Sequence, residues 1–250
     1  QNISGIFNFP RARGKYIALM DCDDYWCEPD KLERQVRYLE AHRDCSMTVH
    51  AAAVQNDRGE LVNRNLMRPY RGDRDLSPSE LVDKAGSFPF GAMLLRREVV
   101  EKLPDWYFRC PVGDRPLELL AALKGYCHYA DRFDSVYRFH GSGSWTEEMK
   151  SGDLKQKQDR YARAMRELYR AFDRESGGRY HREAVSAARR VYFLTRVNLR
   201  DYGEIFSPRN RRYYRELPLR DRFFIRAERE LPFLFAGLRR VRDRIFRQEG

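Results

Sequence analysis

Hydrophobic and polar positions alternate in short blocks along the first part of the chain, and each block predicts one strand or one helix. Residues 16–20, YIALM, form a continuous apolar run, which indicates a strand buried on both faces, as in a parallel sheet. Residues 29–42, PDKLERQVRYLEAH, carry apolar side chains at helical spacing, and Pro29 suits the first helical position. This alternation predicts an α/β domain over residues 1–146.

Further elements of both kinds are predicted downstream. The expected strands are residues 46–54, 90–97, 126–130 and 135–140. The expected helices are residues 77–86, with Ser77 as the cap and Gly86 after the end, residues 97–103 and residues 114–125.

The pattern changes near residue 145. From Glu147 onward it is almost wholly helical, with apolar stripes at helical spacing and no strand alternation. Residues 176–179, SGGR, and 206–210, FSPRN, are predicted joints between helices. We therefore expect a second part, residues 147–250, to be a helical C-terminal extension.

Charge and cysteine content limit the partners and the cellular compartment that the sequence predicts. The 48 Lys plus Arg outnumber the 37 Asp plus Glu, so the formal net charge is +11, which favours anionic partners such as nucleotide phosphates, nucleic acid or an acidic membrane leaflet. The five cysteines form no C-x-x-C pair, which argues against a disulfide framework or a structural zinc site and favours a reducing, cytoplasmic compartment. No apolar run approaches the length of a membrane span.

Three aspartates follow the first predicted strand directly. Asp21, Asp23 and Asp24 lie between a strand's carboxyl end and a helix start, where open α/β sheets bind ligands. Two such carboxylates can hold Mg²⁺ or Mn²⁺ together with substrate phosphates. The alternative is that they cap the next helix and face water. Their place behind a buried strand and before Tyr25 and Trp26 favours a site.

The surrounding sequence, ARGKYIALMDCDDYWCEPDKLERQVRYLE (residues 12–40), resembles the core signature of family-2 glycosyltransferases. The resemblance implies a GT-A fold, a mixed sheet flanked by helices, that binds a nucleotide-sugar through a metal at a D-x-D motif. It implies that Asp21 and Asp23 bear on the ribose and the metal-diphosphate. It also implies that Asp24 supports the acceptor or sugar side.

Three downstream segments extend the resemblance. FPFGAMLLRR places Gly91 where the family lets the backbone approach the donor, although a plain turn is nearly as good an interpretation. VGDRPLELLAALKG places Asp114 at the family's catalytic base, although Asp114 also suits a helix N-terminus. YRFHGSGSW implies that His140 completes the metal or diphosphate site, although a lone histidine at a strand end is usually structural.

Two residues of that last segment are further candidates for substrate contacts. Arg138 follows the tyrosine of the motif, and Trp145 closes it. Trp145 or Trp26 could stack on a sugar ring, but each is more often a core residue.

The resemblance covers residues 8–146 and implies a function. Members open with a nucleotide-binding half that has no counterpart before Tyr16, so we expect that half to be missing from this sequence. The implied reaction is metal-dependent transfer of a sugar, with inversion, from a nucleotide-diphosphate-sugar to a hydroxyl of a glycan, polysaccharide or lipid-linked precursor. Asp114 would take the proton from that hydroxyl.

The C-terminal residues 231–246, LPFLFAGLRRVRDRIF, combine arginines with Phe and Leu. Such a helix can lie at an acidic membrane surface, which would place the protein peripherally at the inner face of the cell membrane. The pattern slightly favours the alternative, a helix packed on the catalytic domain.

Three other functions fit parts of the sequence. A nucleic-acid-binding protein fits the charge, but the basic residues are spread out and no known binding module is present. A phosphatase of the aspartyl-phosphate type also uses D-x-D, but here Asp24, Tyr25 and Trp26 follow in place of small residues. A transferase-like scaffold without turnover is the third.

Overall fold

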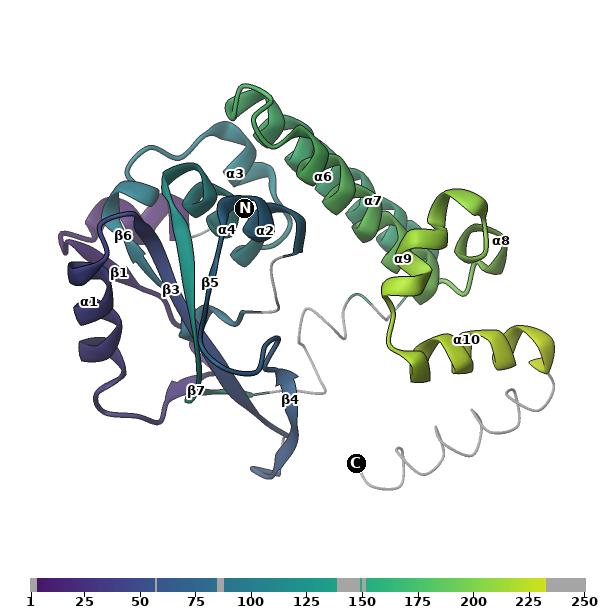
Figure 1. Ribbon diagram of the computed structural model, residues 1–250, viewed down its shortest axis with the longest axis horizontal. Helices are drawn as coiled ribbons and strands as arrows, with labels where there is room; N and C mark the ends of the chain where they lie inside the picture. The colour runs from purple at the N-terminus through teal and green to yellow at the C-terminus, as the bar shows by residue number, and fades with distance from the viewer. Residues whose placement is uncertain (1–3, 57, 85–87, 139–148, 150–151, 233–250) are drawn as a thin grey trace. The chain divides into compact units, whose positions relative to one another are not determined.

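The computed structural model describes residues 4–56, 58–84, 88–138, 149 and 152–232 (Figure 1). The chain divides into two compact units, Gln1–Arg189 and Arg190–Gly250, and each is described by itself below.

The first unit is built on a mixed sheet. Its strands are β1 (Tyr16–Ala18), β2 (Tyr25–Trp26), β3 (Cys45–Gln55), β4 (Leu61–Met67), β5 (Arg74–Leu76), β6 (Leu94–Arg96) and β7 (Tyr126–Arg138). The order is β1-β6-β3-β7-β2, with β4 paired to β3 and β5 paired to β7. Only β3 and β7 run parallel among the described strands. The predicted fold class, a mixed α/β sheet of GT-A type followed by helices, is confirmed.

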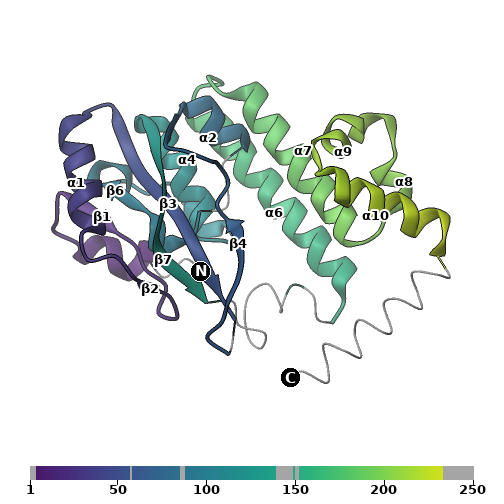
Figure 2. The same ribbon diagram turned by 60° about the horizontal axis from the view of Figure 1, so that its bottom comes forward.

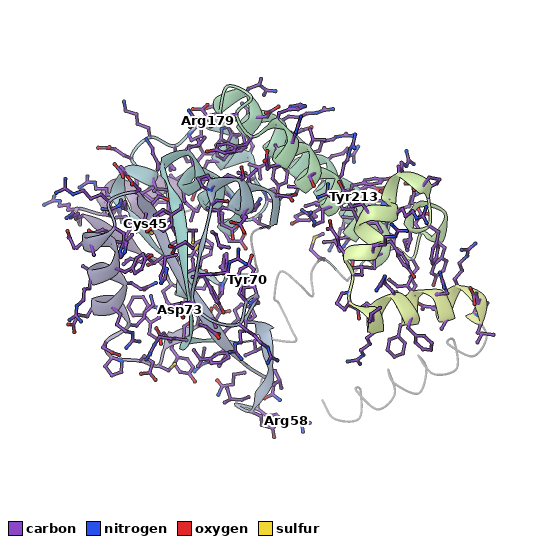
Figure 3. The ribbon with its side chains drawn as sticks, viewed as in Figure 1. Cys45, Arg58, Tyr70, Asp73, Arg179 and Tyr213 are labelled. Carbon is purple, nitrogen blue, oxygen red and sulfur yellow. The ribbon has the colours of Figure 1, made fainter. Side chains whose placement is uncertain are left out.

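The central pair β3 and β7 carries the core because both strands are long and apolar. Met47, Val49 and Ala51 of β3 are almost fully buried. Helix α1 (Lys31–Ala41) covers one face of the sheet, while α2 (Pro78–Lys84) and α4 (Asp114–Lys124) cover the other (Figures 1 and 2). On the first face, Cys45 at the start of β3 packs with Leu39 of α1 (Figure 3).

The first strand differs from its prediction. The run YIALM contributes only β1, which pairs antiparallel with β6 at the end of the described sheet, and Ala18 is exposed. The expectation of a strand buried on both faces in a parallel sheet is therefore wrong. A short apolar run indicates that some of its side chains are buried, but it does not indicate whether the paired strand runs parallel or antiparallel.

Other boundaries also differ. Residues 90–97 yield a 3₁₀ turn, η3 (Phe90–Ala92), before the short strand β6, and the helix expected at 97–103 is the turn η4 (Arg97–Val99). The two strands expected at 126–130 and 135–140 are one strand, β7. Before β1 lie the short turns η1 (Ser4–Asn8) and η2 (Phe9–Arg11).

Helix α6 (Leu154–Glu175) belongs to the first unit, as does the start of α7 (His181–Asn198). Phe172 of α6 meets Trp106 of α3 (Asp105–Arg109) edge-on and stacks on Tyr180. The joint at 176–179 is confirmed, with Gly177 and Gly178 at positive φ. The predicted domain boundary after residue 146 lies outside the described residues and stays a prediction; by packing, α6 goes with the sheet.

The second unit is helical in its described part. It contains the rest of α7, then α8 (Tyr202–Ile205), η5 (Pro208–Asn210), α9 (Arg211–Glu216) and α10 (Leu219–Glu230). Phe193, Ile205 and Tyr213 form its core (Figure 3). No helix in the described ranges is long and apolar enough to cross a membrane.

Candidate functional site

The three aspartates lie in the turn that connects β1 to β2. The turn closes where the Asp24 backbone N–H donates to the Asp21 carbonyl at 3.2 Å. Strand β2 then pairs with Ser135 and Val136 of β7. Because β2 directly follows the aspartates and pairs with residues near the end of β7, the acidic turn lies beside the carboxyl end of β7.

Asp24 connects the turn to β7 directly. Its Oδ1 accepts a hydrogen bond of 2.8 Å from the backbone N–H of Arg138. The Arg138 guanidinium lies over the Tyr25 ring, 5.1 Å from its centroid. Asp24 and Arg138 therefore hold the turn against the sheet, and their predicted substrate contacts stay predictions.

Gly91 lies behind the same turn. Trp26 Nε1 donates to the Gly91 carbonyl at 2.8 Å. A Cβ added to Gly91 would stand 3.3 Å from Met20 Sδ and 3.7 Å from Ser135 Cβ, so η3 packs tightly behind the residue that precedes Asp21. The role of Gly91 in donor binding stays a prediction, whereas Trp26 acts as a structural clamp between the turn and η3.

Asp114 reaches this region from a distant segment. It is the first residue of α4, and its Oδ1 accepts a 2.7 Å hydrogen bond from the Arg115 backbone N–H. Burial raises the pKa of Asp114. A carboxylate with a raised pKa is a stronger base at neutral pH. The sequence alternative that Asp114 is the N-cap is wrong, because Gly113 holds that position and Asp114 is the first residue of the helix.

The carboxylates of the acidic turn and of Asp114 affect the pKa values of the same residues. Burial raises the pKa of Asp21, and repulsion from Asp23 and then from Asp114 raises it further. The pKa of Tyr137 on β7 is likewise raised by burial and by the four carboxylates Asp24, Asp23, Asp21 and Asp114. Coulombic effects of this kind fall off with distance, so all four carboxylates are near enough to Tyr137 to affect its pKa.

Mutual repulsion among these carboxylates is the observation that fits a bound cation. Within the described ranges, no group of three or more His, Cys, Asp or Glu side chains is arranged to hold a metal ion. Mg²⁺ needs only one or two protein carboxylates when phosphates and water complete its shell, and the prediction that Asp21 and Asp23 supply them stays a prediction. His140 and Trp145 lie outside the described residues.

Sequence reasoning missed three residues near Asp114. Tyr137 precedes Arg138 in the quoted motif, and Arg115 follows Asp114 directly. Tyr161 is one residue of an ordinary apolar helical stripe, yet its pKa is raised by burial and then by Asp114. Nothing in its spacing distinguishes Tyr161 from a core tyrosine.

Two kinds of comparison with known proteins find similarity over part of the chain. The model of the family described as Glycosyl transferase family 2 matches residues 7–104. An uncharacterised protein of Mycobacterium tuberculosis (strain ATCC 25618 / H37Rv) is 29% identical over 140 residues, which are 54% of this chain and 37% of that protein. An uncharacterised glycosyltransferase of Methanocaldococcus jannaschii is 23% identical over 120 residues, which are 44% of this chain and 40% of the relative. The chain thus covers well under half the length of these curated relatives.

Proposed function

Because residues 7–104 belong to a family-2 glycosyltransferase domain, we propose that the protein is a metal-dependent, inverting glycosyltransferase of the hexosyltransferase type. The donor is a nucleotide-diphosphate-sugar, and the acceptor is a hydroxyl of a glycan, polysaccharide or lipid-linked precursor. The observation that supports this proposal is that Asp114, a base candidate from a separate segment, acts electrostatically on Asp21 together with Asp23.

The carboxylate pair Asp21 and Asp23 would serve the donor's diphosphate by holding a cation. Asp21 and Asp23 would hold Mg²⁺ or Mn²⁺, which when bound neutralises the charge that develops on the leaving nucleoside diphosphate. Asp24, held by the Arg138 backbone, keeps the turn in place on the acceptor side. His140 would complete the diphosphate site, and Trp145 would contact the sugar.

Asp114 acts as the general base. Its raised pKa suits proton removal from an acceptor hydroxyl near neutral pH. One base and one displacement at the anomeric carbon invert the configuration, and no covalent intermediate is required. Gly91 leaves the backbone open to the donor, and Trp26 holds that backbone through its carbonyl.

We place the reaction in the cytoplasm, in polysaccharide or cell-envelope synthesis, with peripheral contact at the inner face of the membrane. Helix α10 supports that contact: Leu219, Phe223 and Phe224 are 77%, 68% and 45% exposed, and Arg220 and Arg226 flank them. Residues 233–246 of the segment first considered lie outside the described residues. Flotation with anionic liposomes tests the contact, and no binding at low salt would exclude it.

The catalytic proposal is tested by nucleotide-sugar hydrolysis with Mn²⁺ in the full-length protein. Asp23→Ala should lose donor binding together with turnover. Asp114→Asn should keep donor binding while kcat falls by about 10²-fold or more. Asp105→Asn is a matched control, because Asp105 also opens a helix but is exposed and forms an ion pair with exposed Arg109. Equal activity in all the variants would refute the assigned roles.

A further inference from the structure

The residue after Asp114 is anchored on several sides. The Arg115 side chain is only 11% exposed, and its Nη1 donates to the Leu81 carbonyl at 2.8 Å while its Nη2 donates to the Val82 carbonyl. Both carbonyls belong to the last turn of α2, where backbone oxygens lack helical partners and the helix dipole is negative. The guanidinium thus completes the carbonyl end of α2.

Two further side chains hold the same guanidinium. Arg115 Nη1 donates to Glu118 Oε2 at 2.6 Å, and Arg115 Nε donates to the Tyr169 hydroxyl at 2.7 Å. Burial raises the pKa of Glu118, and the adjacent Arg115 acts in the opposite direction. A buried cation is tolerated only when its donors are satisfied, and here they are used by α2, α4 and α6 together.

Helix α6 presents one face to the start of α4. Tyr161, Met165 and Tyr169 recur every four residues and so share a face. Met165 and Tyr169 are buried, and the Tyr169 hydroxyl accepts a hydrogen bond from Arg115. The charge of Asp114 contributes to the raised pKa of Tyr161. This face lies outside residues 7–104, the segment that the family model matches.

We infer that Arg115 is a positioning residue for Asp114, and that α6 takes part in the catalytic site by holding Arg115 through Tyr169. The inference rests on the proposed role of Asp114 as base. Arg115 is the next residue of the same helical turn, so the contacts that hold its side chain help to fix the first turn of α4, where Asp114 lies. Its own N–H also fixes the Asp114 carboxylate.

The guanidinium also affects the charge state of Asp114. Its positive charge favours the ionised carboxylate, against burial, which favours the neutral acid. The other ionisable groups that act electrostatically with Asp114 are Asp21, Cys110, Glu118, Tyr137 and Tyr161. Loss of the cation should therefore raise the pH at which Asp114 ionises.

Three variants separate positioning from charge. Tyr169→Phe removes the hydrogen bond from Arg115 and keeps the aromatic ring. Arg115→Lys keeps the positive charge but loses the planar guanidinium with its several N–H donors, and Arg115→Gln loses both the charge and the guanidinium. Tyr180→Phe is the matched control, because its hydroxyl also bonds α4, at the Ala122 carbonyl near the opposite end of the helix. Each is made in the full-length protein.

The readouts are kcat and KM for nucleotide-sugar turnover and the titration of Asp114 by ¹³C NMR, with its signal assigned from Asp114→Asn. Tyr169→Phe should lower kcat several-fold, and Arg115→Lys about 10-fold or more, with the donor KM unchanged. Arg115→Gln should raise the Asp114 titration midpoint by about one pH unit, and Arg115→Lys should restore it. Tyr180→Phe should match the parent in both measurements.

Two results have distinct meanings. If Tyr169→Phe and Arg115→Lys keep the parent kcat and Arg115→Gln leaves the Asp114 midpoint unmoved, the inference is overturned. Full turnover in Asp114→Asn would instead refute the proposed function. If Arg115→Gln does not fold, kcat in Tyr169→Phe and Arg115→Lys decides the question.

Discussion

Lys31 carries a buried amine directly behind the acidic turn. It is the first residue of α1 and only 1% exposed, and its Nζ lies 4.1 Å from the Trp26 ring centroid. Within the described part of the chain, Nζ has no hydrogen-bond partner. Burial lowers the pKa of Lys31 to about 7, although attraction to Asp134 opposes the shift. Asp134 offers only partial compensation because it also pairs with Arg34 at 2.9 Å.

The lowered pKa predicts how stability depends on pH. Between pH 7 and pH 10.5 the unfolded chain binds a proton at Lys31 that the folded protein binds only weakly, so stability rises with pH across this window. A difference between 10.5 and about 7 corresponds to about 5 kcal/mol at low pH, since one pH unit is worth about 1.4 kcal/mol. At pH 7, where the folded amine is half protonated, about 4 kcal/mol of destabilisation remains.

Lys31→Met should remove this destabilisation, because methionine fills similar space without a charge. We expect the variant to be more stable than the parent by up to about 4 kcal/mol at pH 7 and about equally stable near pH 10.5. Urea unfolding at a series of pH values measures the difference, and other titrating groups cancel between the two proteins.

The opposite outcome is equally clear. If Lys31 stays charged in the fold, its contacts with Trp26 and Asp134 stabilise the protein. Lys31→Met would then be less stable than the parent at pH 7, and the difference would not change between pH 7 and pH 10. That result would refute the reasoning from burial.

Two further predictions concern the sheet. Gly125→Ala should lower the free energy of unfolding by about 3 kcal/mol or more, because the new Cβ would stand 2.0 Å from the Asp44 carbonyl oxygen. Gly203→Ala is the control: the atom nearest to its new Cβ is 3.6 Å away, so the change should be neutral or stabilising by up to about 1 kcal/mol. Urea unfolding measures both. A hydrogen bond from Arg68 lowers the pKa of Asp131 to about 2, so this carboxylate stabilises the fold above about pH 4 and the effect is lost as pH falls toward 2. Asp131→Asn should remove about 1 to 2 kcal/mol at pH 6 and less than about 0.5 kcal/mol at pH 2, and an equal loss at both would contradict the shift.

Features that depend on neighbouring residues could be predicted from the sequence. The helix expected at 29–42 is α1, Lys31–Ala41, because its apolar spacing and Pro29 act within a few turns. The strand expected at 46–54 is β3, Cys45–Gln55, since a run buried on both sides needs no knowledge of its partner. The acidic turn could be predicted as well, because its aspartates directly follow the first strand in the sequence.

Features that join distant segments depended on the tertiary structure. The parallel pairing of β3 with β7 and the antiparallel pairing of β1 with β6 decide which strand ends meet, and no local pattern encodes a partner's direction. The contact between Arg115 and Tyr169 likewise joins side chains 54 positions apart.

The sequence by itself therefore determined elements such as α1 and β3 and the acidic turn, through short-range spacing of apolar and charged residues. Only the tertiary structure decided that Asp114 comes near enough to raise the pKa of Asp21 and that α6 holds Arg115. The physical reason is that burial and Coulombic repulsion depend on distance in space, and packing of the whole unit sets that distance.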